Sequence, residues 1–252
     1  MKRINLLLLI IAAFALTNCK LEDSVSQPEP SPGIISKTGE YGTDVSEPSG
    51  LTLGANNSTL WTVSDNTNHV YQLSLNGTIL KELFFEGNDL EGIAFDKRDG
   101  TLWLAEEQLR QVVHIDTNGN ELGRFDVTNL EGSGNSGLEG ISLDTTFTTF
   151  VLNEKSPRLW ARLDDNYAAQ TIKEITDVDD LSGIFYDEKR NAFWIVSDKS
   201  QLFFLWDEEN GITQKAELDY QKAEGVAVDI EKGIVYIVSD ATWKLYVYSL
   251  KL

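Results

Sequence analysis

The sequence predicts an all-β protein, a single five-bladed β-propeller of four-stranded blades, and three observations lead to this prediction. One unit recurs five times: a glycine opens an apolar alternation, and an acidic residue about fifteen positions later closes a second apolar run. The five glycines are separated by 42, 48, 43 and 42 residues, which is the size of a propeller blade. Apolar residues within each copy alternate with period two, as in strands. The glycine–acid pairs are Gly50 and Asp65, Gly92 and Glu107, Gly140 and Glu154, Gly183 and Asp198, and Gly225 and Asp240.

The second copy displays the strands of a blade most clearly. Strands are predicted over residues 92–96, 101–106, 112–116 and 121–127. Two of the connections between them, residues 97–100 and 117–120, contain the Gly, Asn and Asp that tight antiparallel turns require. Each blade is therefore expected to be an antiparallel meander.

The fifth copy ends one strand short. Its predicted strands span residues 225–229, 234–239 and 244–250, and the sequence stops at Leu252. Residues 34–40 precede Gly50 much as residues 212–218 precede Gly225. We therefore expect the N-terminal segment to supply the outer strand of the last blade, which closes the ring and leaves no long open sheet edge. The predicted propeller spans residues 34–252.

The N-terminus indicates export. A basic start, Lys2-Arg3, precedes an apolar run at residues 6–16, which suits a secretory signal and is too short to cross a bilayer. The following residues 16–19 resemble a bacterial lipoprotein box, although Asn18 departs from the usual small residue. This resemblance implies a signal peptide over residues 1–18 and lipidation of Cys19, the single cysteine. The alternative is an ordinary signal peptide with an incidental cysteine.

Residues 19–33 hold three prolines among polar residues and are predicted to be a disordered tether. The acidic pair Glu22-Asp23 resembles a surface-export signal, so we expect an exported protein that is lipid-anchored in the cell envelope, at the outer membrane or cell surface. Contact with the membrane is then made through the lipid on Cys19.

The charge excludes one class of partner. Removal of residues 1–18 takes away Lys2 and Arg3, so the formal charge changes from -19 to -21. Nucleic-acid binders need an excess of Lys and Arg, so no nucleic acid is expected as a partner. The expected partner is an unknown small ligand or protein, and the propeller is expected to be a monomer.

Both repeated polar positions are expected at one rim of the ring, because residues that open the first strand of a blade lie beside those that close its antiparallel neighbour. Crowded carboxylates repel one another, which raises their pKa values or recruits a cation. Calcium is the candidate metal because it takes six or more oxygen ligands. The opening set is Glu47, Glu91, Glu139 and Glu224, with Ser182 in the fourth copy, and the closing set is Asp65, Glu107, Glu154, Asp198 and Asp240. The predicted metal ligands are Glu91, Glu139, Glu224, Asp65, Glu107, Glu154, Asp198 and Asp240.

A structural role for these repeated residues remains open at this point. Glycine permits close backbone approach near the axis, and the Ser-Asp pairs after the second strands are able to satisfy turn amides. The glycine and the closing acid recur in every blade. Such repetition favours the structural role, because every blade needs it, whereas a catalytic site requires asymmetry.

Asymmetry appears in three cations near the closing acids. Lys155, Lys199 and Arg110 are candidates for binding the phosphate or carboxylate of a ligand, and the alternative is that they neutralise neighbouring acids. Residues 129–137 lengthen one connection and are expected at the same rim, either as a flexible lid or as a loop without a function.

No catalytic residue is predicted. The two histidines, His69 and His114, lie outside the repeated rim positions, and no Gly-x-Ser-x-Gly elbow is present. Zinc chemistry lacks its usual ligands. An enzyme built on this sequence would have to be metal-assisted and carboxylate-based.

Four segments carry a family resemblance: residues 47–51, 60–65, 89–94 and 223–227. With these motifs the chain resembles the SdiA-regulated family of bacterial envelope propellers, which are related to NHL-repeat and phytase-like propellers. The resemblance covers the whole propeller and implies the fold. It also implies a secreted or membrane-attached protein, with a metal at the channel mouth in some members, but it does not specify a reaction.

Three functions are compatible with the sequence. The leading hypothesis is a lipid-anchored, non-enzymatic binding propeller with an acidic, calcium-binding channel mouth. The second is a calcium-dependent phosphoesterase-like hydrolase that uses the rim carboxylates with Lys155, Lys199 and Arg110. The third is a purely structural protein-interaction module whose rim is solvated and empty.

Overall fold

A computed structural model describes residues 34–132 and 136–251, all of which belong to one compact unit. The predicted signal peptide (residues 1–18), Cys19 and the predicted tether (residues 19–33) lie outside the described residues. Among the described residues, no helix is long and apolar enough to cross a membrane. The one helical element is a short 3-10 turn, η1 (Ala55–Asn57).

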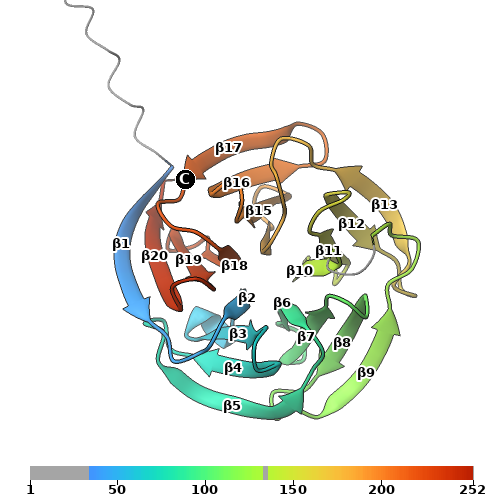
Figure 1. The fold of residues 1–252 in the computed structure, drawn as a ribbon, viewed down its shortest axis with the longest axis horizontal. Coiled ribbons are helices and arrows are strands. Elements are labelled where there is room, and N and C mark those ends of the chain that lie inside the picture. The colour runs from blue at the N-terminus through green and yellow to red at the C-terminus, as the bar shows by residue number, and fades with distance from the viewer. Residues whose placement is uncertain (1–33, 133–135, 252) are drawn as a thin grey trace, which may run out of the picture. The chain divides into compact units, whose positions relative to one another are not determined.

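Within residues 34–132 and 136–251, twenty strands form five antiparallel four-stranded sheets set around a common axis (Figure 1), which confirms the predicted five-bladed propeller. Blade 1 contains β2 (Pro48–Leu53), β3 (Leu60–Ser64), β4 (His69–Leu73) and β5 (Ile79–Glu86). Blade 2 contains β6 (Leu90–Asp96), β7 (Thr101–Glu106), β8 (Gln111–Ile115) and β9 (Glu121–Asp126). Blade 3 contains β10 (Leu138–Leu143), β11 (Thr149–Asn153), β12 (Leu159–Leu163) and β13 (Ala169–Glu174). Blade 4 contains β14 (Ile184–Asp187), β15 (Ala192–Ser197), β16 (Leu202–Asp207) and β17 (Gly211–Glu217).

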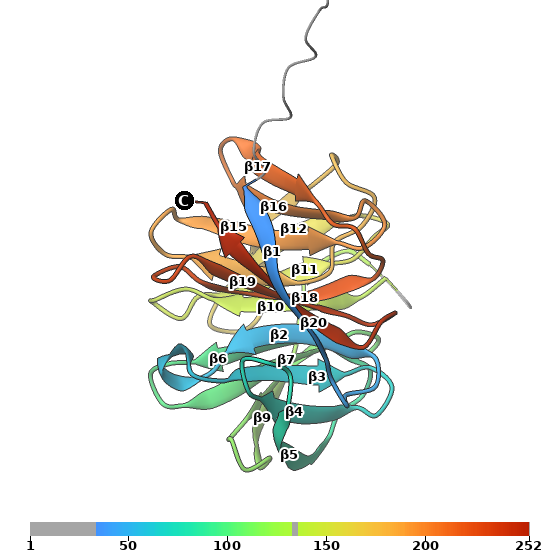
Figure 2. The ribbon, with the colours of Figure 1, turned by 90° about the vertical axis from the view of Figure 1, so that its left-hand side faces the viewer.

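Blade 5 joins the two ends of the described chain. Its strand order is β1-β20-β19-β18, so β1 (Ile35–Gly42) is the outer strand beside β18 (Ala223–Asp229), β19 (Ile234–Ser239) and β20 (Lys244–Leu250). The antiparallel register runs from Ile35 opposite Leu250 to Gly42 opposite Lys244. Figures 1 and 2 show β1 lying along β20. The predicted closure of the last blade by the N-terminal strand is confirmed.

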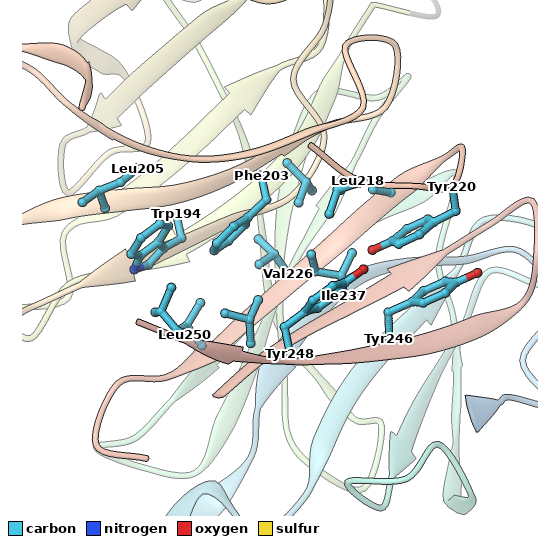
Figure 3. Packing of buried hydrophobic residues seen from close by; sticks show 14 of the residues in the cluster. Trp194, Phe203, Leu205, Leu218, Tyr220, Val226, Ile237, Tyr246, Tyr248 and Leu250 are labelled. Carbon is cyan, nitrogen blue, oxygen red and sulfur yellow. The ribbon is translucent and has the colours of Figure 1, made fainter. Parts of the chain in front are cut away.

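The apolar cores lie between neighbouring blades. Between blades 4 and 5, Trp194 and Phe203 stack with ring centroids 4.7 Å apart, and Tyr220 stacks on Tyr246 (Figure 3). Aromatic residues bury large areas and prefer such offset contacts, so they contribute strongly to packing of blade against blade. The aromatic residues of the second strands, Trp61, Trp103, Trp194 and Tyr236, are all buried.

Candidate functional site

In blades 1, 2, 3 and 5 the inner strand begins with a β-bulge at one end of the channel, whereas β14 of blade 4 begins after Gly183 without one. In blade 2, Leu90 pairs with Glu106 and Gly92 pairs with Ala105, so Glu91 is the extra residue between them. A bulge bends the strand and turns a side chain away from its regular direction. The same register shift leaves out Glu139 in blade 3 and Glu224 in blade 5. The residues directly before the inner glycines, here called the ring residues, are Ser49, Glu91, Glu139, Ser182 and Glu224.

One member of the predicted opening set stands elsewhere. Ser49, not Glu47, precedes Gly50 and is the ring residue of blade 1. Glu47 corresponds to Asp89 of blade 2, because both have a left-handed backbone (φ 45 and 56) and their carbonyl oxygens accept hydrogen bonds from Asp65 N–H and Glu107 N–H. Glu47 stands three residues before Gly50, as Asp89 does before Gly92, whereas the other predicted opening glutamates directly precede their glycines.

The five inner glycines bring the ring residues together. A Cβ on Gly50 would lie 2.7 Å from the carbonyl oxygen of Glu91 in the next blade, and one on Gly183 would lie 2.4 Å from that of Glu224. A Cβ on Gly225 would meet the carbonyl oxygen of Ser49 at 2.5 Å, which completes the circle. Each glycine therefore packs directly against the backbone of the next ring residue, and any side chain would push the blades apart.

All eight predicted metal ligands line one cavity of about 320 Å³, here called the mouth. The closing acids follow the second strands and lie beside the ring residues, as the antiparallel pairing predicts. Ten carboxylates and two lysines line the mouth. Its charged residues are Glu47, Asp65, Glu91, Glu107, Glu139, Glu154, Asp180, Asp198, Glu224, Asp240, Lys155 and Lys222.

The three predicted cations separate in space. Lys155 lines the mouth and pairs with Glu154, whereas Lys199 reaches the same carboxylate at 3.7 Å from just outside it. Arg110 does not line the mouth. Its guanidinium donates to Asn153 Oδ1 at 2.8 Å and to the carbonyl oxygens of Leu130 and Glu131 at 3.2 Å. Arg110 therefore fastens the connection between blades 2 and 3.

The predicted lid lies only partly in the described chain. Residues 133–135 are outside it, while the flanking residues of the connection contact Arg110 and blade 3. Ser136 donates to the carbonyl oxygen of Lys155, and the N–H of Gly137 donates to the Glu107 carboxylate at 3.2 Å. The C-terminal flank of this connection therefore helps to form the mouth.

Burial and mutual repulsion raise the pKa values of five acids at the mouth, Asp65, Glu91, Glu107, Glu139 and Glu224. Burial, followed by the charge of Asp89, raises the pKa of Asp65 to about 6. Burial raises the pKa of Glu107 and of Glu224 to about 7, and nearby Asp89 and Asp198 add to these two shifts. The pKa values of Glu91 and Glu139 lie well above their ordinary value for the same reason. Near neutral pH the carboxyl groups of Asp65, Glu107 and Glu224 therefore exchange protons readily, and a bound cation would favour their ionised forms.

Two groups of carboxylates have the spacing of metal ligands. Asp65, Asp89 and Glu91 form one group, and the second consists of Glu107, Glu139 and Glu154. Within each group the ligand oxygens lie within 4.8 Å of one another. The first group also contains Asp89 Oδ2, a buried oxygen without a hydrogen-bond partner among the described residues. A cation bound here would satisfy that oxygen.

Sequence reasoning missed three residues that line the mouth, Ser49, Asp180 and Lys222, and it assigned Glu47 to the wrong repeat position. The repeat contains a signal for them. Two positions before each ring residue stand Glu47, Asp89, Gly137, Asp180 and Lys222. An alignment of the five copies on the ring residue, and not on the nearest glutamate, shows this shared position, from which Glu47, Asp180 and Lys222 line the mouth.

The fold and the mouth define a five-bladed propeller with an acidic opening at one end of its channel. Over residues 40–247 the sequence matches the family described as SdiA-regulated, and the chain belongs to this family.

Solved structures share this fold at low sequence identity. The glutaminyl cyclase of Myxococcus xanthus is 12% identical with a TM-score of 0.69, and the alignment covers 86% of this chain and 96% of that one. A streptogramin B lyase is 14% identical with a TM-score of 0.52 and coverages of 86% and 98%. A protein of unknown function from Bacteroides caccae is 10% identical with a TM-score of 0.53 and coverages of 76% and 70%. At these identities the likeness concerns the fold alone.

Proposed function

We propose that the chain is a lipid-anchored envelope propeller that acts as a non-enzymatic binding module, with calcium in its acidic mouth. The observation that carries this proposal is the convergence of ten carboxylates on one cavity of about 320 Å³ that contains only two lysines. Eight unbalanced negative charges in so small a space strongly disfavour full ionisation. A divalent cation offsets this repulsion and permits the acids to ionise.

The donor set supports calcium in particular. Every charged ligand candidate in the mouth offers oxygen, and neither histidine nor cysteine lines the cavity. Calcium takes six to eight oxygens in a flexible arrangement, which suits side chains contributed by different blades. The groups Asp65, Asp89, Glu91 and Glu107, Glu139, Glu154 are the candidate ligands. The unpartnered Asp89 Oδ2 supports the first group.

Anchoring rests on the sequence of the N-terminus. A lipid on Cys19, followed by a tether, would hold the propeller at the envelope and leave the mouth free for a ligand or protein partner. Metabolic labelling with a palmitate analogue tests this step. We expect label on the wild-type chain and none on Cys19→Ala, and label retained by Cys19→Ala would disprove the proposed anchor.

The hydrolase hypothesis is less well supported. This hypothesis requires Lys155, Lys199 and Arg110 to act together. Arg110, however, lies outside the mouth and donates hydrogen bonds to Asn153 and to two backbone carbonyl oxygens. Lys155 and Lys199 both approach the single carboxylate of Glu154. The likeness to a glutaminyl cyclase and a streptogramin B lyase transfers neither activity to this chain, because it is a likeness of fold.

Calcium titration by calorimetry tests the proposal. Residues 20–252 contain every strand of the closed ring, so this fragment retains the whole propeller. After treatment with a chelator, it should bind calcium at neutral pH with release of protons, measured as a dependence of the binding enthalpy on the buffer. Absence of binding would leave the purely structural module as the better description. Binding together with hydrolysis of p-nitrophenyl phosphate would favour the hydrolase.

A further inference from the structure

A second, wider cavity adjoins the mouth on the side of blades 4, 5 and 1. This vestibule has a volume of about 720 Å³ and shares Glu47, Asp65, Asp198, Lys222 and Asp240 with the mouth. Beyond those shared residues it is lined by Lys199, Gln201, Gln221, Ala241 and Trp243. The vestibule therefore does not follow the fivefold symmetry of the propeller. Recognition of one particular ligand requires an asymmetric site of this kind.

Trp243 occupies a position that recurs in every blade, directly before the third strand. The backbone carbonyl at this position accepts a hydrogen bond from the residue that follows an outer strand, and Trp243 accepts one from Thr43 N–H at 2.8 Å. The recurring position holds Asn68, Arg110, Arg158, Gln201 and Trp243.

In three of the other blades the side chain at this position ties its blade to the next. Asn68 Oδ1 accepts from Leu90 N–H at 3.1 Å, and Gln201 Nε2 donates to the carbonyl oxygen of Tyr220 at 3.0 Å. Arg110 donates to two backbone carbonyls of the following connection. The indole N–H of Trp243 makes no hydrogen bond to any residue of the described chain, so Trp243 lacks the structural role of its counterparts.

The backbone and the exposure of Trp243 are both unfavourable for the fold. Its φ of 51° lies in the left-handed region, where a bulky aromatic residue is an outlier and asparagine is favoured. Its exposed fraction is 47%, whereas the other five tryptophans are at most 8% exposed. The same conformation recurs at Asn68, Arg110 and Gln201, so the turn imposes it whichever residue stands there. The indole of Trp243 is not part of the buried core, and asparagine would suit the left-handed backbone of this turn better.

We propose that Trp243 is the stacking platform for a ligand made of sugar rings that carry carboxylate groups. The apolar face of a pyranose ring fits against an exposed indole. The amides of Gln201 and Gln221 supply donors and acceptors for ring hydroxyls. The carboxylate lies toward Lys199 and Lys222 and completes the coordination of the cation in the mouth. This inference rests on the proposed calcium site, because without a cation the mouth repels a carboxylate.

Quenching of tryptophan fluorescence by acrylamide tests this inference, since Trp243 is the one tryptophan that solvent reaches easily. The probe is trigalacturonate, the neutral control is maltotriose, and calcium is bound first and verified by calorimetry. We expect trigalacturonate to protect Trp243, with the quenching constant falling about twofold or more, and chelation of calcium to abolish the protection.

Two substitutions separate ligand binding from folding. Trp243→Asn installs the residue that blade 1 uses at this position, so it should preserve or raise the melting temperature while binding of trigalacturonate, measured by calorimetry, falls about tenfold or more. Phe84→Ala changes an exposed aromatic side chain on outer strand β5 and should leave binding unchanged.

Each outcome has a definite meaning. Calcium binding with no protection of Trp243, equal binding of maltotriose, or wild-type affinity in Trp243→Asn overturns the inference and leaves the calcium site standing. Failure to bind calcium overturns the proposed function itself. Calcium-dependent binding that is lost in Trp243→Asn and kept in Phe84→Ala supports both.

Discussion

Glu139 lies beside Glu91 of the neighbouring blade, and burial together with the charge on Glu91 raises the pKa of Glu139. The two residues come close because each is the extra residue of a bulge at the start of an inner strand and the adjacent glycines pack against the next blade. Repulsion between two acids is unfavourable in the absence of a cation. A cation would relieve this repulsion, so the pair Glu91 and Glu139 provides a test of whether the mouth binds a cation or has only a structural role.

Replacement of Glu139 by Gln should therefore have opposite effects on stability and binding. Removal of one buried charge relieves repulsion, so the metal-free melting temperature should rise or remain unchanged. Loss of a charged ligand should weaken calcium binding about tenfold or more. Thermal unfolding and calorimetry measure both. Glu208→Gln, in an exposed turn, serves as the control and should change neither. A destabilised Glu139→Gln protein with normal calcium affinity would favour the structural role.

Addition of a methyl group at an inner glycine should disrupt the ring. In Gly183→Ala the new Cβ would lie 2.4 Å from the carbonyl oxygen of Glu224, which forces blades 4 and 5 apart. We expect a loss of about 1–3 kcal/mol in unfolding free energy and weaker calcium binding. Gly42→Ala is the matched control, because no atom lies within 4 Å of its added Cβ. Equal stability of the two variants in urea unfolding would disprove the close packing of the ring.

Stability of the metal-free protein should depend on pH in an unusual direction. Burial first, and then Asp198, raises the folded-state pKa of Glu224 from 4.5 to about 7, and burial raises that of Glu107 to about 7. Between these pH values the folded protein holds more protons than the unfolded chain, so stability is highest below the unfolded pKa and falls as pH rises through 7.

The melting temperature measured in chelator should therefore fall by several degrees between about pH 5 and pH 7.5, since 1 kcal/mol shifts a domain of this size by about 2–4 °C. Saturating calcium should flatten this dependence, because the cation favours the ionised acids. A melting temperature that rises over the same range in chelator is the contrary result.

Arg110 offers a test of its position. Replacement by Ala removes hydrogen bonds to Asn153 and to two carbonyl oxygens, so unfolding free energy should fall by about 1–3 kcal/mol. Because Arg110 does not line the mouth, calcium affinity should stay within about twofold of wild type. Lys155→Ala, which removes a cation from the mouth, is the comparison and should strengthen calcium binding. Loss of calcium affinity in Arg110→Ala would place Arg110 in the ligand site after all.

Closure of the ring by β1 predicts the effect of a truncation. Removal of residues through Gly42 exposes the edge of β20 and takes away Ile35, which packs against the core between blades 4 and 5. We expect a melting temperature lower by about 10 °C or more and a tendency to aggregate, both visible in thermal unfolding and size-exclusion chromatography. A chain that begins at residue 34 keeps β1 and serves as the control. Equal stability of the two would mean that β1 is dispensable.

The sequence predicts the propeller well because each blade repeats the same strands and turns. The spacing of Gly50 to Gly225 defines the number of blades, and the missing fourth strand of the last copy predicts β1. In an antiparallel pair the start of one strand lies beside the end of the other, and this also predicts that Asp65 and Glu91 lie at the same rim of the ring. These features depend on local pattern and chain order, which a sequence contains directly.

The details of the mouth depend on register and on contacts between blades. In four blades the inner strand begins two residues before its glycine, whereas β14 of blade 4 begins after Gly183, and in blade 1 Ser49 rather than Glu47 is the ring residue. Arg110 follows a closing acid in the sequence, yet its left-handed backbone directs it to the next connection. Trp243 is one of six tryptophans in the sequence, and only its exposure and backbone distinguish it from the buried ones.

The most direct test of the central claim is an anomalous difference map from crystals of residues 20–252 grown with saturating calcium. We predict a peak inside the mouth, with carboxylate oxygens about 2.3–2.6 Å away, contributed by Asp65, Asp89 and Glu91 or by Glu107, Glu139 and Glu154. A map with no peak in the mouth, or with peaks only on the outer surface of the blades, would contradict the account.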